Sequence, residues 1–252
     1  MLVLKELVKQ LDILLEPKAY NDYCPNGLQV QGREQVRKIA TAVTASQNIL
    51  DQAVAAGADA LLVHHGYFWK NEPPSITGMK YRRLATLIKN DISLLAYHLS
   101  LDAHSELGNN VELARILGWQ ITDGLDAGNS RSIGLVGSAM KDKTLGEIAA
   151  RIQRELDRKP LVIGDLSKEI KKIGWCTGAA QGFLDQASEA GCDLYISGEI
   201  SENTVHAARE LGVAYIAAGH HATERFGVLA LGRWLQDKYG IEHIALDEKN
   251  PV

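Results

Sequence analysis

The chain of 252 residues lacks the features that mark membrane, secreted and duplex-DNA-binding proteins. Its longest apolar runs are far too short to span a bilayer, and its first residues mix charges into an apolar pattern, unlike a signal peptide. Its three cysteines, Cys24, Cys176 and Cys192, are widely spaced and form no C-x-x-C pair, so we expect no disulfide framework and a reducing, cytoplasmic location. The net charge of −4 is opposite in sign to that expected of a duplex-DNA-binding protein.

Motifs of the most familiar nucleotide and hydrolase sites are missing as well. The sequence contains no G-x-x-x-x-G-K-S/T loop, no G-x-G-x-x-G after a strand and no G-x-S-x-G elbow. Phosphate binding by a P-loop and hydrolysis by a serine triad are therefore not expected. The basic stretch at residues 80–83 lies beside a helical pattern and is interpreted as a solvated helix face.

Apolar runs of strand length alternate with helical patterns through the whole chain. The clearest strand candidates are residues 59–63, 92–96, 194–196 and 213–217. Helical patterns at residues 47–56 and 111–117 each end at a glycine, which is the expected stop after the last helical residue. This alternation predicts an α/β fold built from strand–helix–strand units with mostly parallel sheets.

An internal repeat extends this prediction. Residues 38–66 align with residues 172–200 without a gap, and 11 of the 29 positions are identical, among them a glycine that ends a helix and an aspartate that opens a strand. The sequence therefore predicts two related α/β domains that arose by internal duplication. A segment rich in Gly, Asp and Ser at residues 119–143 indicates the crossover between them. The predicted domains are residues 1–125 together with 215–252, and residues 126–214.

Histidines and carboxylates follow strand candidates in both halves of the chain. The set comprises His64 and His65, His98 with Asp102, His220 with Glu224, and Glu199, which takes the place of His65 in the second repeat. Imidazole nitrogen and carboxylate oxygen together suit Zn, Mn, Fe, Co or Ni. In open parallel α/β sheets, binding sites form beyond the carboxyl ends of the strands. The sequence therefore predicts a metal site to which both halves contribute.

Several of these residues also have an interpretation as structural or surface residues. His64 and His65 are adjacent, and because strand side chains alternate, one can be a ligand while the other is structural. His98 fits a hydrogen-bonded structural role as well as it fits ligation. Asp102 and Glu224 are each compatible with a place at the surface.

The second half offers two adjacent histidines, His220 and His221. Only His220 lies four residues, or about one helical turn, before Glu224, so His220 is preferred as the ligand and His221 is placed near the site. His206 lies in the preceding helical pattern and can line the same cleft. His243 lies in a terminal amphipathic strand and is interpreted as structural.

Four stretches of the chain carry a resemblance to a known family. They are residues 25–30 (PNGLQV), 63–66 (VHHG), 98–104 (HLSLDAH) and 219–224 (GHHATE). Over essentially its whole length the chain resembles the dinuclear metal-centre proteins known as GTP cyclohydrolase I type 2 homologues, or Ngg-interacting factor three-like proteins, especially their enterobacterial members. The resemblance implies a two-domain α/β fold with a metal site in the cleft between the domains. It also implies toroidal homohexamers whose metal sites face an internal cavity.

The resemblance further implies a set of metal ligands. Two divalent cations per subunit would be held by His64, His65, Asp102, His220 and Glu224, with His98 near the site. We expect metal-dependent hydrolysis of the cyclohydrolase type, acting on a nucleotide or a related small molecule, and Glu199 and His206 are our candidates for moving protons. The alternative is a non-catalytic metal-binding scaffold or interaction protein whose metals staple the two domains.

Overall fold

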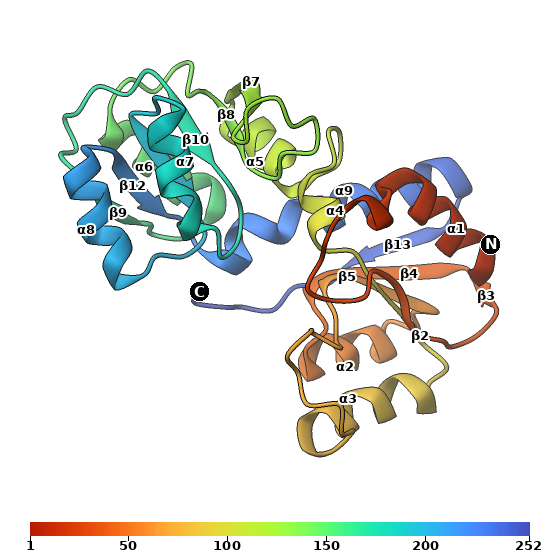
Figure 1. Cartoon of the computed structure of the whole chain (residues 1–252). Helices are drawn as coiled ribbons and strands as arrows, with labels where there is room; N and C mark the ends of the chain where they lie inside the picture. Colours follow the sequence, from red (N-terminus) through yellow and green to blue (C-terminus); the bar gives the residue numbers. More distant parts are fainter. The chain divides into compact units, whose positions relative to one another are not determined.

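The computed structural model describes all 252 residues, which divide into two units. Unit 1 comprises Met1–Leu101 and Gly227–Lys249, and unit 2 comprises Asp102–Phe226 and Asn250–Val252. Each unit is a β-sheet with helices on both faces, and helix α9 (His220–Tyr239) has its first residues in unit 2 and the remainder in unit 1 (Figure 1). None of the helices combines the length and the apolar character needed to cross a bilayer.

The sheet of unit 1 has five strands in the order β13-β4-β5-β6-β2. They are β2 (Gly27–Val30), β4 (Lys38–Thr44), β5 (Ala60–His65), β6 (Ser93–Ala96) and β13 (Glu242–Ala245). The strands from β13 to β6 are parallel, and β2 pairs antiparallel with β6. Two short strands, β1 (Leu2–Val3) and β3 (Gln35–Val36), form a separate antiparallel pair.

Unit 1 has several helical segments. They are α1 (Leu4–Leu15), the 3-10 turn η1 (Pro17–Ala19), α2 (Gln47–Ala55) and α3 (Gly78–Lys89), and the short α4 (Leu99–Asp102) follows β6. Helices α1, α2 and α3 bury apolar residues. The buried residues of α1 are Leu4, Leu7, Leu11 and Leu15. Their spacing of three and four residues gives one apolar stripe along the helix. Helices α2 and α3 lie on the other face of the sheet (Figure 1), where Leu50 and Leu87 pack with Leu61 of β5.

The sheet of unit 2 has six strands in the order β7-β8-β10-β11-β12-β9. They are β7 (Gln120–Gly124), β8 (Leu135–Ser138), β9 (Leu161–Ile163), β10 (Ile173–Trp175), β11 (Leu194–Ser197) and β12 (Ala214–Ala217). Strands β10, β11 and β12 are parallel, and the outer strands pair antiparallel with their neighbours.

Four helices complete unit 2 and give it two core layers. They are α5 (Asn109–Leu117), α6 (Leu145–Leu156), α7 (Leu184–Glu189) and α8 (Glu202–Leu211), with the 3-10 turn η2 (Gln181–Phe183) before α7. Buried residues of α5 and α6 pack on one face of the sheet, and those of α7 and α8 pack on the other. This is the arrangement expected when helices connect parallel strands.

The two halves of the sequence repeat fold alike. In unit 1, Ile39 of β4 pairs with Ala60 of β5, and in unit 2, Ile173 of β10 pairs with Leu194 of β11. These are equivalent positions of the repeat, so the two parallel pairs have the same register. A helical segment connects the strands in both cases, formed by α2 in unit 1 and by η2 with α7 in unit 2. The predicted α/β fold with an internal duplication is confirmed.

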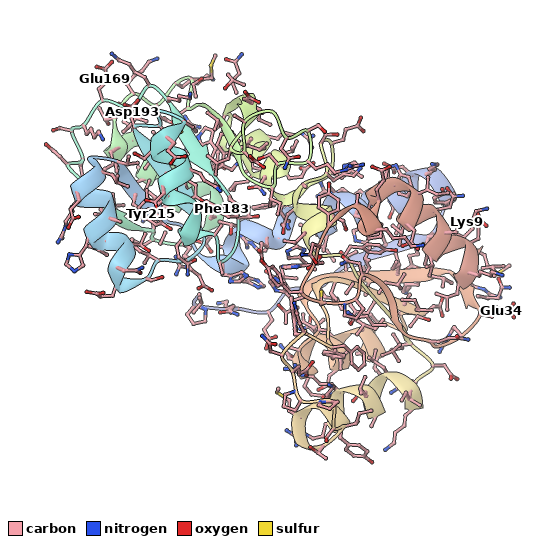
Figure 2. All side chains as sticks on the ribbon, viewed as in Figure 1. Lys9, Glu34, Glu169, Phe183, Asp193 and Tyr215 are labelled. Carbon is pink, nitrogen blue, oxygen red and sulfur yellow. The ribbon has the colours of Figure 1, made fainter.

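Equivalent aspartates organise the start of the second strand in each repeat. Asp59 accepts hydrogen bonds of 2.7 and 3.0 Å from the backbone N–H groups of residues 37–38. Asp193, labelled in Figure 2, accepts bonds of 2.9 Å from those of residues 171–172. Hydrogen bonds to a carboxylate are stronger than those between neutral groups. The aspartate therefore ties the first residues of the two strands together in the same way in both units.

The unit boundaries differ from those expected from the sequence. Residues 102–125 belong to unit 2, because Leu113 of α5 and the following Trp119 are buried in the same core as α6. Residues 215–226 also belong to unit 2, because β12 pairs with β11 and Ala222 joins that core. The chain then returns to unit 1, where β13 pairs with β4.

Candidate metal centre

Three histidines of unit 1 gather at the carboxyl end of its parallel strands. His64 and His65 are the last residues of β5, and His98 follows β6. Their ring centroids lie 4.6, 5.0 and 5.7 Å apart, and one ring nitrogen of each lies within 4.8 Å of the other two. Three imidazole nitrogens at this spacing suit ligation of a transition-metal ion.

The rings of His64 and His65 are held through Nδ1. Nδ1 of His64, a fully buried residue, lies 3.0 Å from the carbonyl oxygen of Tyr97. Nδ1 of His65 lies 3.2 Å from Oγ1 of Thr44. Because the carbonyl of Tyr97 only accepts, Nδ1 of His64 donates, and the lone pair of the neutral ring is on Nε2. A hydrogen bond at one ring nitrogen is the usual way in which a protein orients the other towards a metal.

His98 is oriented by a buried carboxylate. Its Nδ1 lies 2.7 Å from Oδ1 of Asp22. The other carboxylate oxygen, Oδ2, accepts hydrogen bonds from the side chain of Asn26 and from the backbone N–H of Leu99. Burial by itself raises the pKa of the Asp22 carboxyl, but the hydrogen bond and charge of His98, with the bond from Asn26, lower it to about 2. Asp22 is therefore ionised at neutral pH and fixes the direction of the His98 ring.

A second group of possible ligands in unit 1 suits a metal less well. It comprises Asp22, Cys24 and His98. Burial, reinforced by the charge of Asp22, raises the pKa of the Cys24 thiol to about 12. A thiol binds metals as the thiolate, so a metal at this group would have to displace the proton of Cys24. The three histidines are therefore the better candidate ligands of unit 1.

Two of the stretches that carried the family resemblance meet beside these histidines. Nε2 of Gln29 donates to the carbonyl of Tyr67 at 3.0 Å, and its Oε1 accepts the N–H of Tyr67 at 2.7 Å. Gly66 lies between His65 and Tyr67, and a side chain there would overlap with both Gln29 and Ala96. Glycine at this position and Gln29 together let the chain turn directly after the histidine pair.

In unit 2, His220 lies between two carboxylates. Its Nε2 is 3.1 Å from Oε2 of Glu224, one turn further along α9, and its Nδ1 is 2.6 Å from Oε1 of Glu199. Burial lowers the pKa of His220, but the two carboxylates outweigh this effect and raise it to about 9. The negative field that favours a proton on His220 also favours a divalent cation at Nε2, in reach of Glu224.

Asp102 is a buried carboxylate of unit 2, with 5% of its surface exposed. Its Oδ1 accepts a hydrogen bond of 2.8 Å from Asn109 and lies 3.4 Å from Oγ1 of Thr177. Glu224 is 2% exposed, and a side chain on Gly178 would overlap with its carboxylate. A buried carboxylate is stabilised by hydrogen bonds or by a cation, so both residues are candidate cation ligands.

The other histidines singled out in the sequence have different surroundings. His206 lies on the exposed side of α8, where its Nε2 is 3.0 Å from a carboxylate oxygen of Glu202. The backbone N–H of His221 donates to the carbonyl of Val252. Nε2 of His243 lies 2.8 Å from Oγ1 of Thr41 within unit 1. None of the three lies in a group of possible metal ligands.

Sequence reasoning missed Asp22, Asn109, Thr177 and Gly178, which contact the candidate ligands. Only Asp22 left a signal, because it precedes the stretch at residues 25–30 that carried the family resemblance. No motif or repeat in the sequence pointed to the other three, whose contacts with the ligands are seen only in the folded chain. The sequence analysis named Glu199 as a candidate for moving protons but did not identify it as the partner of His220.

Comparison with known proteins agrees with this picture. The model of the family Duf34/NIF3 (NGG1p interacting factor 3) matches residues 2–251. A Pseudomonas aeruginosa protein named GTP cyclohydrolase 1 type 2 homolog is 55% identical over 251 residues, covering 100% of this chain and 99% of the relative. An Escherichia coli protein of the same name is 48% identical over 248 residues, covering 98% of both chains.

Solved structures of similar proteins have the same fold. One, described as protein ybgI of unknown function, is 47% identical with a TM-score of 0.95 and full coverage of both chains. Another, from Thermus thermophilus, is 35% identical with a TM-score of 0.89, again over the full length of both. The sequence match and the shared fold both extend over essentially the whole chain, which therefore belongs to the Duf34/NIF3 family.

Proposed function

We propose that the chain binds two divalent metal ions and uses them to hydrolyse a nucleotide or a related small molecule. The proposed ligands are His64, His65, Asp102, His220 and Glu224, with His98 as a sixth. The observation that carries the proposal is the donor set that each unit assembles, three imidazoles in unit 1 and the His220–Glu224 pair in unit 2. The names of the relatives, GTP cyclohydrolase 1 type 2 homolog, support a cyclohydrolase-type reaction, in which water attacks C8 of a purine.

The donors are chemically suited to this task. Bound divalent metals lower the pKa of a coordinated water and so supply a nucleophile near neutral pH. Imidazole with carboxylate is a donor set for Zn, Mn, Fe, Co or Ni. Glu199 holds Nδ1 of His220 and thereby directs Nε2 of that ring towards Glu224. The side chain of Glu199 is 34% exposed, so it can also exchange a proton with solvent.

His206 is the second residue proposed to move protons, and it needs a separate test. Its side chain is 61% exposed and pairs with Glu202 on the same helix. A catalytic His206 predicts that His206→Ala lowers turnover without changing metal content. A solvated ion pair predicts no change in either quantity, because exposed pairs contribute little to stability.

Turnover by the metal-loaded full chain tests the proposed hydrolysis. The protein is loaded with Zn, Mn, Fe, Co or Ni in turn and incubated with GTP, with oxidised purine nucleotides and with model esters, and the products are separated by chromatography. The matched control is Glu224→Gln, which keeps the shape of the side chain and removes its charge. We expect turnover of at least one substrate class by the native chain only. Equal, background-level turnover by both proteins on every substrate would reject the proposal.

A non-catalytic scaffold, in which the metals staple the two units, is the second candidate. The burial of His64, Asp102 and Glu224, each at most 5% exposed, favours it, because structural metal sites are closed to solvent. It predicts that chelation greatly lowers the melting temperature and that no turnover occurs with any metal. The hydrolase predicts an open coordination position that an added anion such as azide occupies, which spectroscopy of the Co-loaded protein detects.

The assembly and location of the protein follow the family resemblance. We propose a closed homo-oligomer, in particular a toroidal hexamer, because closed symmetric assemblies are the common outcome for soluble homo-oligomers. Light scattering that gives the mass of a monomer at micromolar concentration would rule this out. We also propose a cytoplasmic location, which accords with three cysteines that are all buried and not disulfide-bonded.

A further inference from the structure

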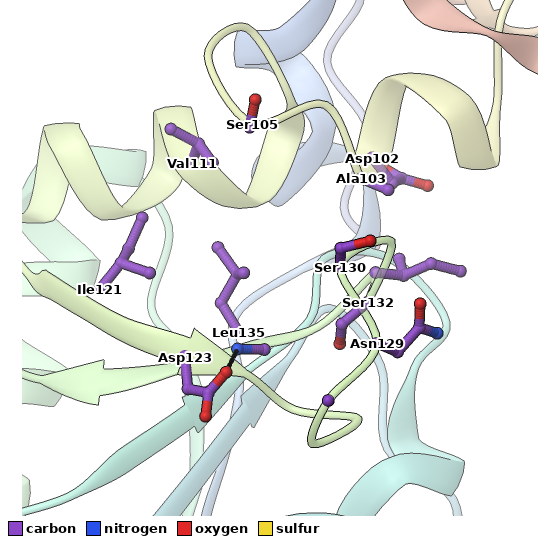
Figure 3. A pocket seen from close by; sticks show the side chains of 13 residues that line it. Asp102, Ala103, Ser105, Val111, Ile121, Asp123, Asn129, Ser130, Ser132 and Leu135 are labelled. Carbon is purple, nitrogen blue, oxygen red and sulfur yellow. Dashed lines mark hydrogen bonds between the residues drawn. The ribbon is translucent and has the colours of Figure 1, made fainter.

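Unit 2 contains a cavity of about 430 Å³ at one end of its sheet. Side chains from β7, from β8, from the first turn of α5 and from the loop at residues 124–133 surround it (Figure 3). Asp102 and the adjacent Ala103 also line it. Clefts of roughly 300–1,000 Å³ are the usual size of sites for small organic ligands. The cavity is therefore large enough for a small organic molecule.

The walls of the cavity combine an apolar side with a hydroxyl-bearing side. Val111, Ile121 and Leu135 provide aliphatic surface. Ser105 and Ser130, both exposed, provide hydroxyl groups, and Figure 3 shows Ser130 on the loop that faces Leu135. An apolar wall with a few polar groups is the composition of a site that packs one face of a ring and orients it by hydrogen bonds.

The charge of the lining selects among such ligands. Asp102 and Asp123 are the ionisable residues of the lining, and no lysine or arginine belongs to it. Arg131 lies in the same loop without lining the cavity. An anionic phosphate chain would lie near two carboxylates, and these like charges repel it. A neutral hydroxylated ligand meets no such repulsion, and a carboxylate is the usual acceptor for the hydroxyl groups of a ribose.

We propose that this cavity binds the uncharged, hydroxylated part of a nucleoside, with the base against Val111, Ile121 and Leu135 and the ribose hydroxyls towards Asp123. The proposal rests on the proposed function in one respect, namely that Asp102 both lines the cavity and belongs to the proposed metal ligands. A nucleoside in the cavity thereby lies beside a metal ligand. The phosphates of a nucleotide contribute nothing to binding in this cavity.

Calorimetric titration of the full chain tests this, with guanosine, ribose and GTP as probes. Titrations are made with the protein as purified and after treatment with EDTA, because bound metals would attract phosphate independently of the cavity. In the EDTA-treated protein we expect guanosine to bind, GTP to bind no better than guanosine, and ribose alone to bind more weakly than either. Absence of guanosine binding, or tighter binding of GTP than of guanosine in the EDTA-treated protein, would overturn the proposal.

Variants in the loop locate the binding. Ser130→Trp places an indole in the cavity and should abolish guanosine binding, whereas Ala127→Trp, an exposed position in the same loop that does not line the cavity, should leave it unchanged. Asp123→Asn should weaken guanosine binding about tenfold, the usual effect of replacing a charged hydrogen-bond acceptor by a neutral one. Equal binding by Ser130→Trp and the native chain would overturn the proposal.

The two proposals fail in different ways. Guanosine binding that Ser130→Trp abolishes, in a protein without turnover, supports the nucleoside site and rejects the hydrolase. Turnover of a purine nucleotide that Ser130→Trp leaves unchanged supports the hydrolase and overturns the nucleoside site. Each result is interpretable because the binding measurement requires no chemistry and the melting temperature of each variant reports whether it folds.

Discussion

Gly178 leaves room for the carboxylate of Glu224 because it has no side chain. A Cβ atom on Gly178 would overlap with Oε1 of Glu224 and lie 3.3 Å from Nε2 of His220. The backbone of Gly178 also has φ = +70°, a conformation that glycine adopts without strain. The lack of space for a side chain and the positive φ angle both favour glycine at this position, beside His220 and Glu224.

Gly178→Ala should therefore weaken metal binding without changing a ligand. The added methyl group displaces the Glu224 carboxylate, and we expect the loss of affinity typical of a disturbed ligand support, about 10- to 100-fold. The matched control is Gly182→Ala, because a Cβ atom there meets nothing within 4 Å. Metal titration with a competing chelator measures both variants. Native affinity in Gly178→Ala would show that Glu224 does not bind metal in the position described.

Glu224 is the proposed bridge between two metals, because a carboxylate has two oxygens that can bind two cations at once. Glu224→Gln should lower the occupancy of both sites, since it removes the charge that offsets repulsion between the cations. His65→Ala should mainly empty one site. His243→Ala should empty neither, because His243 bonds to Thr41 and lies in no group of possible ligands. Elemental analysis of the three purified variants decides the matter, and two metals per chain in Glu224→Gln would disprove the bridge.

Asp22 is expected to support metal binding through His98. Asp22→Asn removes the charge that holds Nδ1 of His98 and permits the ring to turn or change tautomer. Loss of such a partner typically costs about 10- to 100-fold in metal affinity. Asp51→Asn, a surface substitution on α2, is the control. If His98 is a structural residue only, Asp22→Asn will lower the melting temperature while metal affinity stays native.

Gly232 and His243 form a tightly packed pair in unit 1. A Cβ atom on Gly232 of α9 would overlap with the imidazole ring of His243 on β13. Gly232→Ala should destabilise the protein by about 1–3 kcal/mol, as overpacking of a core usually does. Adding His243→Ala removes the ring, so the double variant should be more stable than the sum of the two single effects. Additive effects in thermal unfolding would show that the two residues do not collide.

The three cysteines should resist modification while the protein is folded. Burial, with the charge of Asp22, raises the pKa of Cys24 to about 12, and burial raises the pKa of Cys192 to about 11. Burial also raises the pKa of Cys176 well above its usual value. At mildly alkaline pH, a thiol-specific reagent should therefore modify none of the three cysteines in the folded protein. It should modify all three after the protein is unfolded in guanidinium. Rapid reaction of any cysteine in the folded protein would contradict the described burial.

The sequence predicted the fold well because its strongest signals are local or repeated. Hydrophobic runs, helix-ending glycines and the recurrence of Asp59 as Asp193 identify strand–helix–strand units without knowledge of long-range contacts. The unit boundaries were harder to predict. They depend on which core buries Leu113 and Trp119. The sequence shows that such a side chain is apolar, but it does not show which of the two cores the side chain joins.

The residues that support the candidate ligands were the least predictable part. Thr44 and Gly178 occupy the same place in the two repeats, yet Thr44 bonds to His65 while Gly178 makes space for Glu224. Their roles depend on side chains that folding brings from distant parts of the chain. A repeat predicts a shared backbone, but the two copies have acquired different contacts at the ends of their strands.

The pairing of β13 with β4 has a consequence for the nascent chain. About 200 residues separate the paired positions Lys38 and Glu242, and every strand of unit 2 lies between them. At translation rates of about 5–20 residues per second, about 10 to 40 s pass before β4 meets its outer neighbour. During that interval the edge of β4 has no partner on this side, and an uncovered strand edge is a site for pairing with other chains. Residues 242–245 are therefore synthesised late, and by pairing with β4 they remove an exposed strand edge that could otherwise pair with other chains.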